Sequence, residues 1–314
     1  MQPGKRNSRA TAALAVIVLL AIAAGVGYYL TRGAGVSATS AAGSKIQVVA
    51  AENFWGNLAS QLGGTQVKVI SIVTDPSADP HEYQTSAADA RAISDARLVI
   101  VNGAGYDNWA LNVISAGNTP NQKVLNVQQL TGQPIDANPH LWYSPYFVND
   151  TVKAMYNDLV AIDPADASYF HQQYAALNSS LWQTYMSLEV QIKHQFGGSP
   201  VAATEDIFVY MANATGLKVV SPSGFMEAVA EGNDPPAQDA AAFQQLLQGG
   251  KSAVHVLVYN EQTVTPITES MKSLATQNQI PITPVTETMP LNTTFQAWMG
   301  EELNSLINSL NGKS

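Results

Sequence analysis

Short apolar runs alternate with amphipathic stretches along most of the chain, and this alternation restricts the fold more than any other feature of the sequence. In the first half such runs occupy residues 46–51, 67–73, 98–102 and 123–126, and apolar residues recur at helical spacing between them. Strands that alternate with helices form a parallel sheet covered on both faces. Residues 45–145 are therefore predicted to form one α/β lobe.

The pattern changes between residues 146 and 197, where strand candidates are absent and apolar residues keep a helical period. After the interruption at Asp163-Pro164, residues 165–195 predict one helix of roughly 45 Å, more than a small domain needs. Beyond Gly197 the alternation resumes, with strands expected at 201–204, 219–222, 254–259 and 282–285. We expect two doubly wound α/β lobes, 45–145 and 198–314, joined by a helical segment at 146–197 that contains a long rigid helix. Ligands of such sheets bind beyond the carboxyl ends of the strands, which here means the cleft between the lobes.

The first 44 residues have a different character. A basic stretch at 1–10 precedes the uncharged apolar run 11–30, which is long enough to cross a bilayer of roughly 30 Å as a helix. The basic residues predict a cytoplasmic N-terminus and an extracytoplasmic body. The apolar run could be a signal peptide or an uncleaved anchor, and we favour the anchor. The Gly-, Ala- and Ser-rich residues 31–44 predict a flexible stalk.

Composition excludes several classes of protein. The chain carries a net charge of −9 and, beyond its first ten residues, has no basic cluster, so it is not expected to bind nucleic acid. It contains no cysteine, which rules out a disulfide framework and a lipid-modified cysteine as the membrane tether.

Two histidines and two glutamates stand just after predicted strands or in the loop that enters the helical segment. His81 lies in "DPHEYQTS" and His140 in "NPHLWYSP", whereas Glu205 and Glu287 follow strands of the second half. Two imidazole nitrogens and two carboxylates make a complete shell for a divalent first-row metal ion. Closure of the lobes would bring all four side chains together.

Each of these residues also has an ordinary interpretation. A histidine in a loop is more often solvated than a ligand, and Glu205 and Glu287 could simply stabilise the N-termini of helices. For His171, His194 and His255 the structural interpretation is favoured. Asp79 and Glu82 beside His81 could orient its imidazole or could be solvated loop charges.

Together these motifs resemble the substrate-binding subunits of bacterial zinc/manganese ABC importers, the metal-receptor cluster of the periplasmic-binding-protein superfamily. The resemblance covers the whole body, from "IQVVAAENFWGNLASQLGG" through "DPHEY", "NPHLWYSP", "ATEDIFVYMANATGL" and "VYNEQTVTP" to "PITPVTETMP". It implies two α/β lobes bridged by a rigid helix, and the ligands His81, His140, Glu205 and Glu287. Glutamate replaces the family's usual aspartate at the fourth position, and the His-rich loop of some zinc receptors is absent.

The resemblance implies a monomeric extracytoplasmic receptor, not an enzyme, that captures Zn²⁺ or Mn²⁺ and delivers it to the membrane permease of an ABC importer. Oxygen ligands suit Mn²⁺, but the Irving–Williams order gives Zn²⁺ the higher intrinsic affinity, so zinc is slightly favoured. One alternative is an extracytoplasmic metallohydrolase, although the sequence has no HExxH motif and no nucleophile elbow. A surface adhesin with a structural metal is the other alternative.

Overall fold

The computed structural model describes residues 45–75, 83–117 and 119–312, and the predicted anchor at 11–30 and stalk at 31–44 lie outside these ranges. Residues from Lys45 onwards form one compact unit. Among the residues that are described, no helix is both long enough and apolar enough to span a membrane.

Two four-stranded parallel sheets organise this unit, which confirms the predicted fold class. The first has the order β2-β1-β3-β4 and the second the order β6-β5-β7-β8. Their bounds are β1 Ile46–Glu52, β2 Val67–Val73, β3 Leu98–Val101, β4 Lys123–Asn126, β5 Pro200–Ala203, β6 Lys218–Val219, β7 Val256–Asn260 and β8 Ile282–Val285. Strand β6 is shorter than the predicted strand at 219–222, because Pro222 has no N–H for the ladder and stands just before a helix.

The two sheets share one topology, and it fixes where a ligand can bind. In each sheet the first strand lies between the second and the third, so the winding reverses at the β1/β3 and β5/β7 pairs. The crevice at the carboxyl ends of such a pair is the usual ligand site of open α/β sheets. Four polar residues stand at or just after these ends, namely Glu52, Asn102, Glu205 and Asn260.

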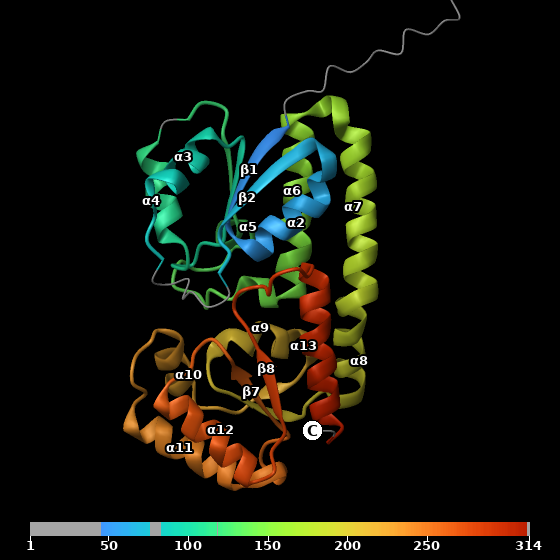
Figure 1. Ribbon diagram of the computed structural model, residues 1–314. Helices are drawn as coiled ribbons and strands as arrows, with labels where there is room; N and C mark the ends of the chain where they lie inside the picture. The colour runs from blue at the N-terminus through green and yellow to red at the C-terminus, as the bar shows by residue number, and fades with distance from the viewer. Residues whose placement is uncertain (1–44, 76–82, 118, 313–314) are drawn as a thin grey trace, which may run out of the picture. The chain divides into compact units, whose positions relative to one another are not determined.

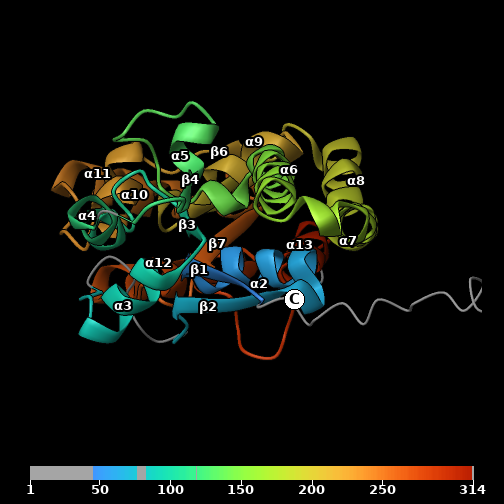
Figure 2. The same ribbon diagram turned by 90° about the horizontal axis from the view of Figure 1, so that it is seen from above.

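Helices cover both sheets (Figure 1). In the first half they are α2 Asn53–Gly63, α3 Ala87–Asp95, α4 Asn108–Ala116, α5 Val127–Leu130 and α6 Pro145–Ile162. In the second half they are α9 Val209–Thr215, α10 Ser223–Ala230, α11 Ala237–Gln248, α12 Pro266–Gln277 and α13 Phe295–Leu310. In both views α3 and α4 lie on the opposite side from α6 and from the linking helices described next (Figures 1 and 2).

The linking segment is helical from Ala167 to Phe196, close to the predicted 165–195. It consists of α7 (Ala167–Leu181), a π-helical stretch η5 (Trp182–Met186) and α8 (Ser187–Phe196). Helix α7 packs on α2 and α6, whereas α8 packs on α9 and α13. The segment thus contacts helices that belong to both halves of the chain.

One apolar cluster continues through both halves. It includes Val48 of β1, Met155 of α6, Ile192 of α8, Val201 of β5 and Leu306 of α13, each of them buried. Close-packed interiors of this kind resist deformation. The two sheets are therefore held by a shared core as well as by the linking helices, which limits how far a cleft between them can open.

Candidate metal centre

His140 stands immediately before the short 3₁₀ helix η3 (Leu141–Tyr143) and is fully buried. Its backbone N–H donates to Asn138 Oδ1 at 2.9 Å, and its ring Nδ1 lies 2.9 Å from the same oxygen. Asp206 Oδ1 lies 3.2 Å from the same Nδ1. Because Nδ1 faces acceptors, it carries the hydrogen of the neutral imidazole, and Nε2 is the nitrogen whose lone pair is free to bind an ion.

The lone pair of Nε2 is the chemically significant feature of His140. This atom is buried and has no hydrogen-bond partner within the described part of the chain. A buried imidazole nitrogen without a partner is costly unless something binds it. Burial lowers the pKa of His140, but the neighbouring Asp206, Glu287 and Glu205 carboxylates outweigh burial and raise it. The site therefore attracts positive charge to this position.

Glu205 and Glu287 come from two different strand ends of the second sheet. Glu205 follows β5 and is fully buried, and Glu287 follows β8 and is nearly so. Asn260 at the end of β7 connects them, since its Nδ2 donates to Glu205 Oε1 and, at 2.9 Å, to Glu287 Oε1. Tyr106 Oη also donates to Glu287 Oε2 at 3.3 Å. The two carboxylates are thus fixed side by side in a buried environment.

Two adjacent buried carboxylates repel each other and are stabilised by a nearby positive charge. Burial, followed by the charge of Glu287, raises the pKa of Glu205 to about 8, although His140 acts in the opposite direction. Glu205 Oε2 is buried and accepts no hydrogen bond from the described residues. A divalent cation would supply the missing charge and a partner for this oxygen.

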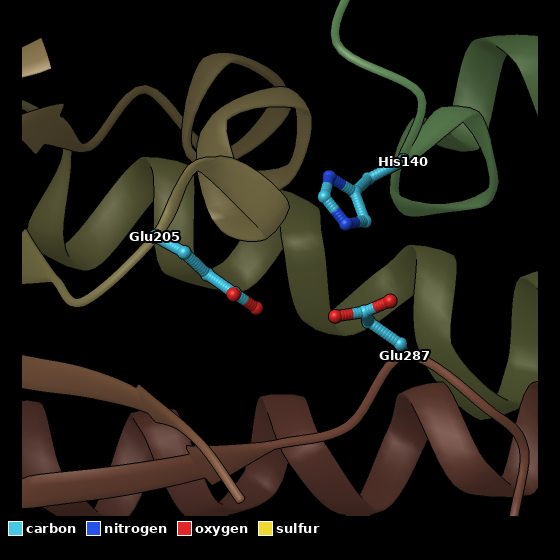
Figure 3. A group of neighbouring side chains, drawn as sticks. All are labelled: His140, Glu205 and Glu287. Atoms are coloured by element: carbon cyan, nitrogen blue, oxygen red, sulfur yellow. The ribbon is translucent and has the colours of Figure 1, made fainter. Parts of the chain in front are cut away.

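The three side chains converge (Figure 3), and one ligand atom from each lies within 4.8 Å of the other two. A tetrahedral zinc ion with bonds of about 2.0–2.2 Å separates its ligands by about 3.5 Å. A modest contraction of the cluster would therefore close it around an ion. The three residues come from the loop before η3 and from the ends of β5 and β8, so an ion would tie together segments from both halves of the chain.

His81, the fourth predicted ligand, lies outside the described residues, as do Asp79 and Glu82. Its segment connects the carboxyl end of β2 with α3. The structure thus brings together three of the four predicted ligands, while the position of His81 stays a prediction. His171 and His255 are exposed, and neither belongs to the cluster.

Sequence reasoning missed the polar residues that orient the ligands. Asn138 binds His140, and its Nδ2 also donates to the Asp206 carbonyl at 2.7 Å, which joins the two halves beside the site. Asn260 holds both glutamates. Each gave a weak signal, Asn138 as the first residue of "NPH" and Asn260 as the polar end of the apolar strand "VLVYN".

A second contact between the halves holds the loop that carries Glu287. Asn53, at the start of α2, donates from Nδ2 to the Met289 carbonyl at 2.7 Å and accepts from the Met289 N–H at 3.2 Å. Asn57, one turn later, accepts from the Phe295 N–H at 3.0 Å. Gln262 fixes the loop from the other side, because its Oε1 accepts from the Glu287 N–H at 2.6 Å.

Replacement of Asn53 by alanine should therefore destabilise the protein and weaken metal binding. Two buried backbone groups of Met289 lose their partner, which should cost about 2–3 kcal/mol of unfolding free energy. Displacement of Glu287, two residues earlier, should lower metal affinity about tenfold. Chemical denaturation and calorimetry measure the two effects, with Asn112→Ala on the exposed face of α4 as the matched control. Unchanged metal affinity in a destabilised Asn53→Ala protein would show that the loop does not position Glu287.

Comparison with known proteins adds independent information. The family model of ZnuA, described as "Zinc-uptake complex component A periplasmic", matches residues 48–309. The chain is 27% identical over 215 residues to "Manganese-binding lipoprotein MntA" of Halalkalibacterium halodurans, a match that covers 65% of this chain and 67% of the relative. It is 25% identical over 262 residues to "Metal ABC transporter substrate-binding lipoprotein FimA" of Streptococcus parasanguinis, a match that covers 77% of this chain and 80% of FimA.

Solved structures share the fold. The periplasmic zinc-binding protein TroA of Treponema pallidum matches with a TM-score of 0.69 and 18% identity, over 85% of this chain and 99% of TroA. A manganese-bound periplasmic metal-binding protein of Candidatus Liberibacter asiaticus matches with a TM-score of 0.70 and 15% identity, over 85% of this chain and 99% of that protein. At these identities the likeness establishes the two-lobed α/β architecture.

Proposed function

The chain belongs to the ZnuA family of zinc-uptake complex components, and from this premise we propose that it captures a divalent transition-metal ion outside the cytoplasm and hands it to the permease of an ABC importer. The proposal rests on the buried cluster of His140, Glu205 and Glu287, in which His140 Nε2 and Glu205 Oε2 have no hydrogen-bond partner among the described residues. A divalent cation would give both atoms a partner. The proposed ligand set is completed by His81.

Zinc and manganese are the cargo ions that fit this donor set. Relatives are named for manganese in MntA and for zinc in TroA. A set of imidazole nitrogen and carboxylate oxygen ligands suits both ions. Zinc is slightly favoured as the cargo because its intrinsic affinity is higher. Carboxylates that become ligands neutralise the charge of the ion in a buried site.

Capture without catalysis is the favoured role. The relatives above are named as binding proteins, and FimA is named as the substrate-binding part of a metal ABC transporter. A hydrolase would need an open coordination position for water. A closed shell of four protein ligands would leave none, which is what distinguishes the receptor from the metallohydrolase alternative.

The N-terminal residues 11–30 are proposed to keep the receptor at the extracytoplasmic face of the membrane. MntA and FimA are named as lipoproteins, whereas the 314 residues of this chain contain no cysteine that could carry a lipid. Mass spectrometry of the protein from membrane fractions tests this. An intact N-terminus supports an anchor, and a new N-terminus near residue 38 would establish cleavage.

Elemental analysis of the purified protein tests the proposed function. We expect one zinc or manganese ion per chain, and competition between the two ions then identifies the tighter ligand. If this protein bound neither ion at micromolar concentration, the proposal would be excluded.

Metal binding should strengthen as the pH rises from about 6 to about 8, because a ligand must lose its proton before it binds. The pKa values of Glu205 and His140 are both raised, so the ion must displace protons that these groups hold more tightly than usual. Calorimetry in buffers of different ionisation enthalpy should therefore detect release of protons on metal binding at pH 7. In Glu205→Gln the contribution of Glu205 should disappear. Binding that releases no protons would contradict this electrostatic account.

A further inference from the structure

A cavity of about 490 Å³ lies between α6, η5, α8 and α9 and shares no lining residue with the metal cluster. Its walls include Tyr146 and Asp150 of α6, Trp182 and Met186 of η5, and Glu189 and Lys193 of α8. Cavities of this size accommodate small organic molecules. The metal-capture function makes no use of it.

Glu189 gives this cavity a polar group that lacks a partner. Its side chain lines the cavity, is only 6% exposed, and has an Oε1 atom that accepts no hydrogen bond from the described residues. Burial raises the pKa of Glu189 to about 8. The hydroxyl of nearby Tyr185 likewise makes no hydrogen bond with any residue that the structure describes, so it does not satisfy the carboxyl. A buried carboxyl without a donor is destabilising, and a ligand in the cavity could supply that donor.

The aromatic walls favour a cationic donor. Tyr146 is 65% exposed and Trp182 is 55% exposed, and both line the same cavity as the Glu189 carboxyl. The faces of Trp and Tyr rings attract cations, and the attraction grows when the site is partly desolvated. Asp150 adds a second acidic group, against the single basic group of Lys193.

The π-helical turn is a further sign of function in this region. Trp182 opens η5 and Met186 closes it, immediately before the helix that carries Glu189. Single π turns inside α-helices recur at functional sites, because they change the direction of side chains at a cost in helix stability. Here both ends of the turn line the cavity.

We propose that this cavity is a second binding site, for a small organic amine in its ammonium form. The ammonium group favours the ionised form of the Glu189 carboxyl, donates an N–H to it and faces the rings of Trp182 and Tyr146, while the apolar body of the ligand packs on Met186. A quaternary ammonium lacks the N–H that the carboxyl requires, and a neutral alcohol lacks the charge that the rings favour. Primary and secondary amines with an apolar body are therefore the chemical class that fits.

Calorimetric titration of the full chain with 2-phenylethylamine, against 2-phenylethanol as a neutral analogue of the same shape, tests this proposal. We expect one amine per chain with a dissociation constant of about 1 mM or tighter, and the alcohol at least about tenfold weaker. The affinity should be the same in the zinc-loaded and the metal-free protein. Equal affinities for amine and alcohol, or no saturable binding in the millimolar range, would overturn the proposal. Displacement of the amine by zinc would also overturn it, because it would place the amine at the metal cluster.

Two variants locate the site. Glu189→Gln and Trp182→Ala should each weaken binding of 2-phenylethylamine about tenfold while zinc binding is unchanged, whereas Ile135→Ala, at a residue that is 80% exposed and outside the cavity, should bind the amine normally. Undiminished binding in Glu189→Gln would reject the assigned carboxyl. If either variant fails to fold, the comparison of amine with alcohol on the unaltered chain still decides the proposal.

Discussion

Replacement of His140 by alanine should lower the affinity for zinc by about 100-fold or more, because loss of an outer partner of a ligand alone costs about 10- to 100-fold. His140 supplies the only nitrogen ligand in the described part of the cluster. Without it, Glu205 and Glu287 would remain as two adjacent carboxylates that repel each other. Competition with a chromogenic chelator measures the loss. Glu205→Gln, which keeps the shape of the side chain and removes its charge, should have a similar effect.

His171→Ala is the matched control for the His140 variant. His171 lies on α7, is exposed and is not part of the cluster, so its loss should leave zinc affinity unchanged. Circular dichroism verifies that each variant is folded. If His140→Ala bound zinc as tightly as the His171→Ala control, the proposed ligand set would be wrong.

Removal of the metal should produce the second large effect, a loss of thermal stability. A ligand present at about 1,000 times its dissociation constant stabilises the folded state by about 4 kcal/mol. For a domain of this size, that corresponds to a rise in melting temperature of about 10 °C. The rise is expected because the ion binds only the folded cluster, in which segments from both halves of the chain meet.

Differential scanning calorimetry with zinc and with a chelator measures this shift. Magnesium should have little effect, because it prefers six oxygen ligands and keeps its own water. At the same zinc concentration the shift should fall to about a third or less in His140→Ala, because a 100-fold loss of affinity leaves the ion at only about 10 times its dissociation constant. A shift of full size in His140→Ala would show that the ion stabilises the protein from another site.

The sequence predicted the strands well where the pattern was local. The bounds of β2, β4 and β8 agree with the predicted 67–73, 123–126 and 282–285. The prediction did less well where packing decides the structure. Helix α10 (Ser223–Ala230) was not predicted, since its eight residues begin with Ser-Gly and are too few for a clear helical period. The π turn at Trp182–Met186 cannot be read from an apolar pattern, because it changes hydrogen bonding and not composition.

The residues of the candidate site also differ in whether a local sequence pattern could identify them. His140, Glu205 and Glu287 could be selected because each is a metal-binding residue type near a strand end or in a loop that faces the cleft, and the family resemblance supported the choice. Asn138 and Asn260 could not, since their importance depends on which side chains they meet after folding. The partner of Asn53 is Met289, which lies 236 residues away in sequence. Local patterns carry no information on such a pair.

A crystal structure of the zinc-loaded protein, with anomalous data at the zinc edge, tests the central claim most directly. One ion should lie about 2.0–2.2 Å from Nε2 of His140 and from a carboxylate oxygen of both Glu205 and Glu287, with His81 as the fourth ligand. Asn138 should remain on Nδ1 of His140. An ion bound elsewhere, or a shell that excludes His140 or either glutamate, would contradict the proposed metal centre.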